Sequence, residues 1–117
     1  MTPKKILEEQ IIMAIKTVED PEIPVNIYEL GLIYDIDIKK VDQSFAHKVV
    51  HSPKYDIEIE MTLTSPNCPV AESLPEEVKT KVSNLADVNT CKVNIVFDPP
   101  WGKEYMSEAA QLELGIL

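Results

Sequence analysis

Residues 55–97 read YDIEIEMTLTSPNCPVAESLPEEVKTKVSNLADVNTCKVNIVF, and their pattern predicts the central unit of the fold. Apolar and polar residues alternate over 55–64, which is typical of a strand with one buried face. Residues 91–97 alternate in the same way, with a predicted inner face of Cys91, Val93, Ile95 and Phe97. Between the two strands lies a helical repeat of apolar residues, formed by Val70, Leu74, Val78, Val82 and Leu85. A strand, a helix and a second strand predict two parallel strands joined by a crossover.

The helix of this unit contains Pro75, and a proline in a helix interior removes a backbone hydrogen bond. We predict one helix over 69–86, with Pro69 in the first position, which suits proline. The alternative is a looser turn over 69–74 followed by a helix that begins at Pro75. In the strand before it, the residues expected to face away from the core are Asp56, Glu58, Glu60, Thr62 and Thr64.

A further strand is predicted over 32–40, where one face carries Leu32, Tyr34, Ile36 and Ile38. We expect it to pair with 55–64 as an antiparallel hairpin across the polar connection 41–53. Before it, helical spacing over 3–18 is set by Ile6, Leu7, Ile11, Ala14, Ile15 and Val18. Pro21 and Pro24 follow that helix and end it.

The chain closes with a short helix predicted from residue 108, for which Ser107 is the N-cap. The predicted order is therefore helix, strand, strand, helix, strand and short helix. Helices that cover the apolar face of a small mixed sheet give a two-layer α+β sandwich. At 117 residues we expect one domain, residues 1–117.

The formal net charge of −9 bears on the partners of this chain. A polyanion repels phosphate backbones and anionic membranes, so we expect neither nucleic acid nor a membrane as partner. No apolar run approaches the roughly 20 residues that span a bilayer. The N-terminal MTPKKILEEQ carries acidic residues where a signal peptide has an apolar stretch, so the expected localisation is cytoplasmic.

Cys68 and Cys91 are the two cysteines, and their positions differ. Cys68 precedes the predicted helix, where free N–H groups and the helix dipole favour a thiolate, the form that binds metal or attacks. It could equally be a small buried residue at a helix start. Cys91 lies on the inner face of a strand, where free cysteine behaves as a small hydrophobe.

The other candidate residues give weaker signals. Asp20 and Glu22 lie beside prolines and could offer oxygen ligands or a base, or simply end a helix in solvent. His47 and His51 lie in the polar connection, for which a solvated loop is the default interpretation. Trp101 follows two prolines and could be a lid, a docking anchor or a plug over the sheet edge. The sequence contains no Walker loop, GxGxxG, GxSxG or CxxC motif.

Three segments together resemble one known family. They are EDPEIPVNIYELGLIYDIDI (19–38), MTLTSPNCPVAESLPEEV (61–78) and NIVFDPPWGKEYMSEAAQLELGIL (94–117). All three resemble, in the same order, the signatures of the SufT/PaaD-like family, which includes the eukaryotic cytosolic iron–sulfur targeting component. The chain departs from the pattern at Asn67, where glycine is common, but asparagine also tolerates left-handed backbone angles.

The resemblance implies a domain of the iron–sulfur cluster assembly type and a non-enzymatic accessory role in assembling clusters or delivering them to apo-proteins. It implies that one surface site gathers Asp20, Glu22, Thr64, Cys68, Trp101, Met106 and Ser107. Cys68 would be the transient ligand of iron or a cluster, or a reactive thiolate, with Asp20 and Glu22 as further possible metal ligands. Thr64 and Ser107 would donate hydrogen bonds to the thiolate or to cluster sulfur.

The implied partners are an iron–sulfur scaffold or carrier and client apo-proteins, and a homodimer is possible through a sheet edge. Three alternatives stay open. In the first, the chain is a metal-free adaptor that docks assembly machinery or clients, with Trp101 and Met106 as anchors. In the second, it serves a phenylacetate-type oxygenase, which the absence of a cysteine-bearing tail after Leu117 disfavours. In the third, it is an enzyme with Cys68 as nucleophile, for which neither histidine is an obvious base.

Overall fold

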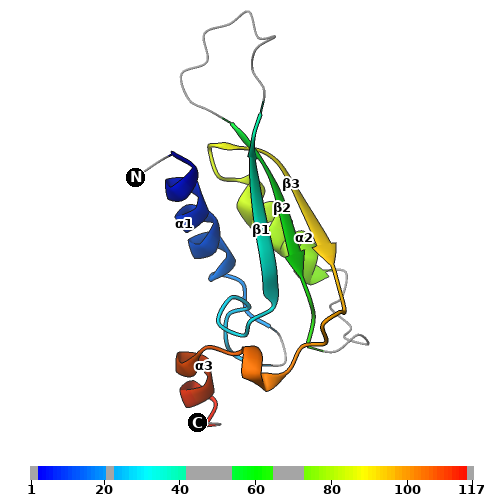
Figure 1. Ribbon diagram of the computed structural model, residues 1–117. Helices are drawn as coiled ribbons and strands as arrows, with labels where there is room; N and C mark the ends of the chain where they lie inside the picture. The colour runs from blue at the N-terminus through cyan, green and yellow to red at the C-terminus, as the bar shows by residue number, and fades with distance from the viewer. Residues whose placement is uncertain (1–2, 21–22, 42–53, 65–72, 116–117) are drawn as a thin grey trace, which may run out of the picture.

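A computed structural model describes residues 3–20, 23–41, 54–64 and 73–115 of the chain (Figure 1). Its elements, in chain order, are α1 (Pro3–Ile15), β1 (Ile33–Lys40), β2 (Tyr55–Met61), α2 (Ser73–Ser83), β3 (Val88–Ile95), the 3₁₀ turn η1 (Lys103–Tyr105) and α3 (Glu108–Glu113). No helix in these ranges is long and apolar enough to cross a bilayer.

The three strands form one sheet in the order β1-β2-β3. β2 pairs antiparallel with β1 and parallel with β3, so the sheet is mixed as predicted. In Figure 1, α2 lies behind the sheet, α1 runs beside it, and α3 lies at the end where β2 and β3 finish. The predicted two-layer α+β fold and its element order are confirmed.

One apolar cluster joins the sheet to the helices. The inner face of β2 contributes Ile57 and Ile59, and α1 contributes Leu7, Ile11 and Ile15, all nearly or fully buried. Val78 and Val82 of α2 join the same cluster. Cys91 is 7% exposed on the inner face of β3, which confirms its prediction as a core residue.

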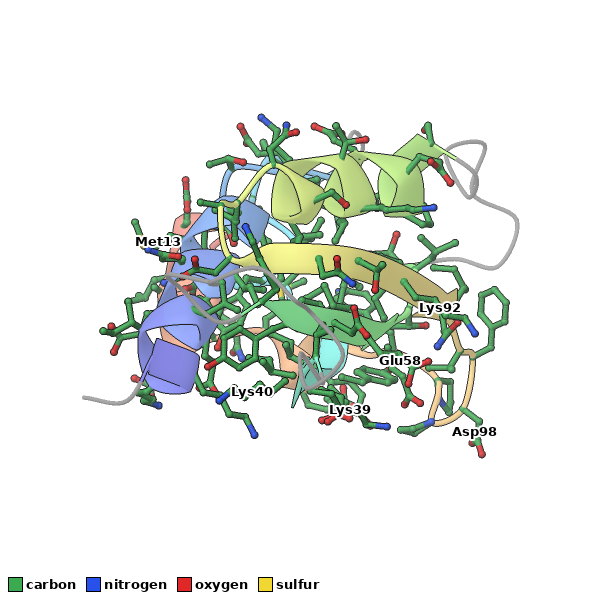
Figure 2. All side chains as sticks on the ribbon, turned by 90° about the horizontal axis from the view of Figure 1, so that it is seen from above. Met13, Lys39, Lys40, Glu58, Lys92 and Asp98 are labelled. Carbon is green, nitrogen blue, oxygen red and sulfur yellow. The ribbon has the colours of Figure 1, made fainter. Side chains whose placement is uncertain are left out.

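The opposite face of the sheet has no helix over it among the described residues. The register places Asp35 opposite Glu60, Asp37 opposite Glu58 and Lys39 opposite Asp56 on this face. Figure 2 shows Lys39 and Glu58 on the side of the sheet away from α2, and Met13 on the outer surface of α1. We call this charged surface the open face.

α1 and α2 end earlier than predicted, at Ile15 and Ser83 rather than at residues 18 and 86. α1 ends at Ile15 rather than 18, because the N–H groups of Thr17 and Val18 bond three residues back, to Ala14 and Ile15, and tighten the last turn. Ile6, predicted to face the core, is 44% exposed. α2 is described from Ser73, so Pro75 lies in its first turn, where its missing N–H needs no partner. Residues 69–72 lie outside the described ranges.

The strand ends also differ from the prediction. β2 stops at Met61 rather than 64, and Thr62, expected to face away from the core, is 1% exposed. β3 spans 88–95 rather than 91–97. Phe97, predicted to face inward, is 52% exposed, because the chain leaves the sheet after the Val96 N–H bonds the Met61 carbonyl at 2.9 Å.

A bulge in β1 corrects the prediction for Tyr34. The register shifts by one residue between Ile33 and Asp35, so Ile33 pairs with Met61 and Tyr34 is the extra residue. Tyr34 therefore leaves the inner set of β1. Its hydroxyl donates to the Pro99 carbonyl, 2.9 Å away, in the segment that follows β3.

Candidate functional site

Three segments meet at the end of the sheet where β2 and β3 finish. These are the described parts of the connection from α1 to β1 (residues 16–20 and 23–32), the residues after β2 (62–64) and the segment after β3 (98–107), which we call the C-terminal arm. Figure 1 shows them together at the end of the molecule that also carries α3. Sites in open sheets with parallel strands form at the carboxyl ends of those strands.

Residues 26–31 form a single helical turn that supports this region. The Asn26 side chain caps it by accepting from the Glu29 N–H at 2.9 Å. Gly31 closes it with a φ of +79°, which glycine adopts freely. The Leu32 N–H bonds the Ile27 carbonyl and the Gly31 N–H bonds the Tyr28 carbonyl, the pair of bonds of a Schellman motif.

The C-terminal arm docks on this turn. The Trp101 indole N–H donates to the Leu30 carbonyl at 2.7 Å, and the Ser107 N–H donates to the Glu29 carbonyl at 2.8 Å. At Gly31 the arm comes so close that an added Cβ would lie 2.7 Å from the Tyr105 carbonyl carbon. The last helical turn before β1 is thus fixed to the segment after β3.

Asp20 is 4% exposed in the connection that leads to this turn. Its Oδ2 accepts from the Ile23 N–H at 3.0 Å, and its own N–H donates to the Val25 carbonyl at 3.3 Å. The carboxylate therefore holds the local turn. Glu22 lies outside the described residues, so the structure does not place it relative to Asp20.

Thr64 follows β2 and leads toward Cys68. Its Oγ1 is buried, yet it has no hydrogen-bond partner among the described residues. A buried hydroxyl without a partner costs free energy, so such an atom marks a place where another group is expected. Cys68 itself lies outside the described ranges, four residues farther along the chain.

The remaining predicted site residues belong to the C-terminal arm. Met106 is 6% exposed and joins the apolar core, while Trp101 is half-buried against it. Ser107 is the N-cap of α3, as predicted, and its Oγ accepts from the Ala110 N–H at 3.2 Å. The hydroxyl proton of Ser107 is not used by that bond, so the side chain can still donate.

Cys91 is unsuited to thiolate chemistry. Burial raises the pKa of its thiol to about 11, and the nearby Lys79 lowers it only in part. The thiol therefore stays protonated near neutral pH. Within the described residues, no three histidine, cysteine or acidic side chains are placed to hold a metal ion. His47 and His51 lie outside those residues.

Sequence reasoning missed the turn that carries the arm. The pattern NIYELG (26–31) contains a capping asparagine, a glutamate three residues later and a closing glycine, which together signal a short helical turn. It also missed Tyr34 and Tyr105, whose ring centroids lie 5.8 Å apart. No local pattern could have paired these two, because a bulge and a distant arm bring them together.

Comparison with known proteins gives consistent results. A family model described as iron–sulfur cluster assembly protein matches residues 8–95. The Fe-S protein maturation auxiliary factor of Porphyromonas gingivalis is 44% identical over 110 residues, covering 94% of this chain and 92% of that protein. The Fe-S protein maturation auxiliary factor YitW of Bacillus subtilis is 38% identical over 113 residues, covering 97% and 98%.

A solved structure has the same fold. The crystal structure of Domain of Unknown Function DUF59 from Bacillus anthracis is similar with a TM-score of 0.76 and 36% sequence identity. The similarity covers 97% of this chain and 95% of that one. The family resemblance predicted from the three sequence segments is therefore confirmed by a family model, by two curated relatives and by a solved fold.

Proposed function

This chain belongs to the iron–sulfur cluster assembly protein family, and on that premise we propose that it is an auxiliary factor that helps deliver iron or clusters to apo-proteins. The relatives named maturation auxiliary factors support this role. The chain would act by binding and handing over its cargo rather than by turning over a substrate. The proposed partners are a scaffold or carrier of clusters and client apo-proteins, in the cytoplasm.

We propose Cys68 as the residue that holds the cargo, and the donor chemistry supports it. Iron–sulfur clusters are held mainly by cysteine thiolates. The chain has two cysteines, and the raised pKa of the buried Cys91 thiol leaves Cys68 as the available one. One thiolate per chain cannot complete a cluster's ligand set, so another chain must supply the rest. Such a shared site favours transient carriage.

The observation that carries the site proposal is the buried Thr64 hydroxyl just after β2, which has no hydrogen-bond partner among the described residues. A hydroxyl four residues before Cys68 is suited to donate a hydrogen bond to a thiolate or to cluster sulfur. The Ser107 hydroxyl, in the arm that docks at the same end of the sheet, donates to no acceptor among the described residues. Asp20, which holds its own turn, would contribute negative charge, and Glu22 would be the further oxygen ligand.

A homodimer is one way to complete the ligand set. β1 and β3 are the two edges of the described sheet, and an edge strand can pair with a second copy. Light scattering after size-exclusion chromatography, with and without iron and sulfide, tests this part. A dimer that forms only with cargo supports shared ligands, and a monomer under both conditions assigns the remaining ligands to a different protein.

The proposal is tested by anaerobic incubation with ferrous iron and sulfide, comparing the native chain with Cys68→Ser and Cys91→Ala. After desalting, bound iron and visible absorbance are measured, followed by transfer to an apo-protein with four cysteine ligands. We expect iron and transfer in the native chain and in Cys91→Ala, and loss of both in Cys68→Ser. Equal behaviour of native and Cys68→Ser protein in both assays would reject the carrier role and favour a metal-free adaptor.

A further inference from the structure

We infer that a hollow on the open face, lined by Tyr34 and Tyr105, is a binding pocket for an arginine side chain presented by a partner protein. The hollow has a volume of about 500 Å³. Its lining includes both tyrosines, Pro99 and two carboxylates, Glu60 and Asp98. Figure 2 shows Asp98 on the side of the sheet away from α2.

The two aromatic rings provide the first part of the argument. Their centroids lie 5.8 Å apart and their planes are tilted by 48°. Tyr105 is 40% exposed, while the Tyr34 hydroxyl is fixed by its bond to the Pro99 carbonyl. Burial, and then the neighbouring Tyr105, raise the pKa of the Tyr34 phenol, so the ring stays neutral. Faces of neutral phenol rings attract cations.

The carboxylates provide the second part. Glu60 and Asp98 line the hollow, and Asp35 lies opposite Glu60 in the register of β1 and β2. Within the described residues none of these three carboxylates has a cationic partner, and no lysine or histidine lines the hollow. A site with two aromatic rings and unneutralised carboxylates complements a cation that has a flat apolar surface.

Carboxylates elsewhere on the open face have side-chain partners. Lys92 lies 4.0 Å from Glu58, and Lys39 lies 3.6 Å from Asp37. Asp56 accepts from the side chains of Asn89 and Thr90. Among the described residues of this face, the carboxylates with neither an ion pair nor a side-chain hydrogen bond therefore lie at the end that holds the tyrosines.

Guanidinium is the cation that fits this combination best. It stacks on aromatic rings and forms forked hydrogen bonds to carboxylates, whereas the ammonium of lysine is a compact, strongly hydrated charge. All 11 basic residues of this chain are lysines, so no arginine of its own can fill the hollow. The arginine must come from another molecule.

A polypeptide is the expected source of this arginine. Asp56 lies farther along β2 from Glu60 and has no ion pair among the described residues, so a basic segment bound at the hollow would reach a further carboxylate. The net charge of −9 would also attract such a segment at a distance. The inference rests on the proposed function in one respect, that this protein works by docking to other proteins.

The test is a titration of cluster-free Cys68→Ser protein with the blocked peptide GRGRG, followed by two-dimensional amide NMR at roughly 20 mM salt. We expect the amide chemical-shift changes to be concentrated at residues 31–35, 60 and 96–105. GRGRG should bind roughly fivefold more tightly than GKGKG. Glu60→Gln and Tyr105→Leu should each weaken binding roughly fivefold, while Tyr105→Phe keeps the ring and the affinity. Glu77→Gln on α2, which removes the same charge elsewhere, is the matched control and should change the affinity for GRGRG less than about twofold.

Several outcomes would overturn the inference. They are shifts spread over the whole surface, equal weakening by Glu77→Gln and Glu60→Gln, equal affinity for the two peptides, and binding of arginine amide as tight as that of GRGRG. Well-dispersed amide spectra of each variant show that it is folded. Because Cys68 is absent from the protein used, failure here leaves the cluster-carriage experiment unaffected, and failure of that experiment leaves this one interpretable.

Discussion

Gly31 is a residue at which two distant parts of the chain come into close contact. Its φ of +79° is a left-handed angle that costs a residue with a Cβ about 1–2 kcal/mol. An added Cβ would also lie 2.7 Å from the Tyr105 carbonyl carbon, and closer still to its oxygen. Contacts this short force the backbone of the C-terminal arm to move.

We therefore expect Gly31→Ala to lower the free energy of unfolding by about 2–4 kcal/mol. The measurement is urea denaturation followed by the fluorescence of Trp101, the only tryptophan. Gly115→Ala is the matched control, because Gly115 has a φ of +73° but no atom within 4 Å of an added Cβ. It should cost only the backbone term, about 1 kcal/mol. Equal losses in the two variants would show that the close approach of Tyr105 contributes nothing.

Cys91 makes stability depend on pH in the alkaline range. Burial raises the pKa of its thiol from 9.0 to about 11, so between these values the folded chain keeps a proton that the unfolded chain releases. Stability from this group is complete below pH 9 and falls as pH rises toward 11. Urea midpoints at about pH 8 and about pH 10.5, in a reducing buffer, should fall more for the native chain than for Cys91→Ala. Parallel pH profiles would contradict the shift.

The burial or capping role of a single residue was predictable where neighbouring residues in the sequence determine it. The alternation over 91–95 placed Cys91 in the core, and the position of Ser107 identified a cap. Gly31 gave no comparable signal for its contact with Tyr105, because that contact depends on how the arm returns to the turn. Thr64 was expected at a site by resemblance, but only the structure shows that its hydroxyl is buried without a partner among the described residues.

At the scale of elements, α3 is a short helix whose start depends on one side chain. Ser107 Oγ accepts from the Ala110 N–H at 3.2 Å, and the Ser107 N–H anchors the arm to Glu29. Ser107→Ala should lower the free energy of unfolding by about 1 kcal/mol, the usual cost of a lost N-cap. Ser107→Asp should keep the cap, because its carboxylate accepts the same bond and suits a helix N-terminus.

The two variants also separate the structural role of Ser107 from its proposed role toward the cargo. Ser107→Asp removes the hydroxyl donor, so it should retain less iron after reconstitution than the native chain while unfolding at a similar urea concentration. Iron retention equal to native in Ser107→Asp would leave Ser107 as a cap alone. Equal stability of Ser107→Ala and the native chain would remove even that role.

Elements were predictable in type and order, while their ends and one register were not. Period-2 patterns identified the three described strands and helical patterns identified α1 and α2, because each buries one face; α3 was predicted from its cap at Ser107, and η1 was not predicted. Phe97 continued the alternation of β3 but is exposed, since the chain turns away after Val96. Tyr34 fitted the alternation expected for the inner face of β1. The bulge makes it an extra residue, so it does not belong to that face. Pattern reasoning assumes an unbroken period, so a single inserted residue defeats it.

The distribution of charge over the whole molecule connects stability with function. The helices cover one face of the sheet, and the open face carries five carboxylates on β1 and β2, namely Asp35, Asp37, Asp56, Glu58 and Glu60. Like charges directly opposite one another on neighbouring strands are destabilising. The pair of Asp35 and Glu60 has no ion-pair partner in the described part of the chain, so the fold retains an unfavourable interaction there.

Removing this repulsion should stabilise the chain and weaken its binding of arginine. We expect Asp35→Asn to raise the free energy of unfolding by about 0.2–1 kcal/mol at low salt. The gain should shrink between about 10 mM and about 150 mM salt, because the screening length falls from about 30 Å to about 8 Å. Urea denaturation at the two salt concentrations measures this gain in stability, with Glu77→Gln on α2 as the control for net charge alone.

The same Asp35→Asn protein should bind the GRGRG peptide more weakly, since Asp35 adds to the negative field at Glu60. A variant that is more stable and binds less would show that the charge is kept for recognition, whereas unchanged or lower stability would show that the two carboxylates do not repel each other in the folded chain.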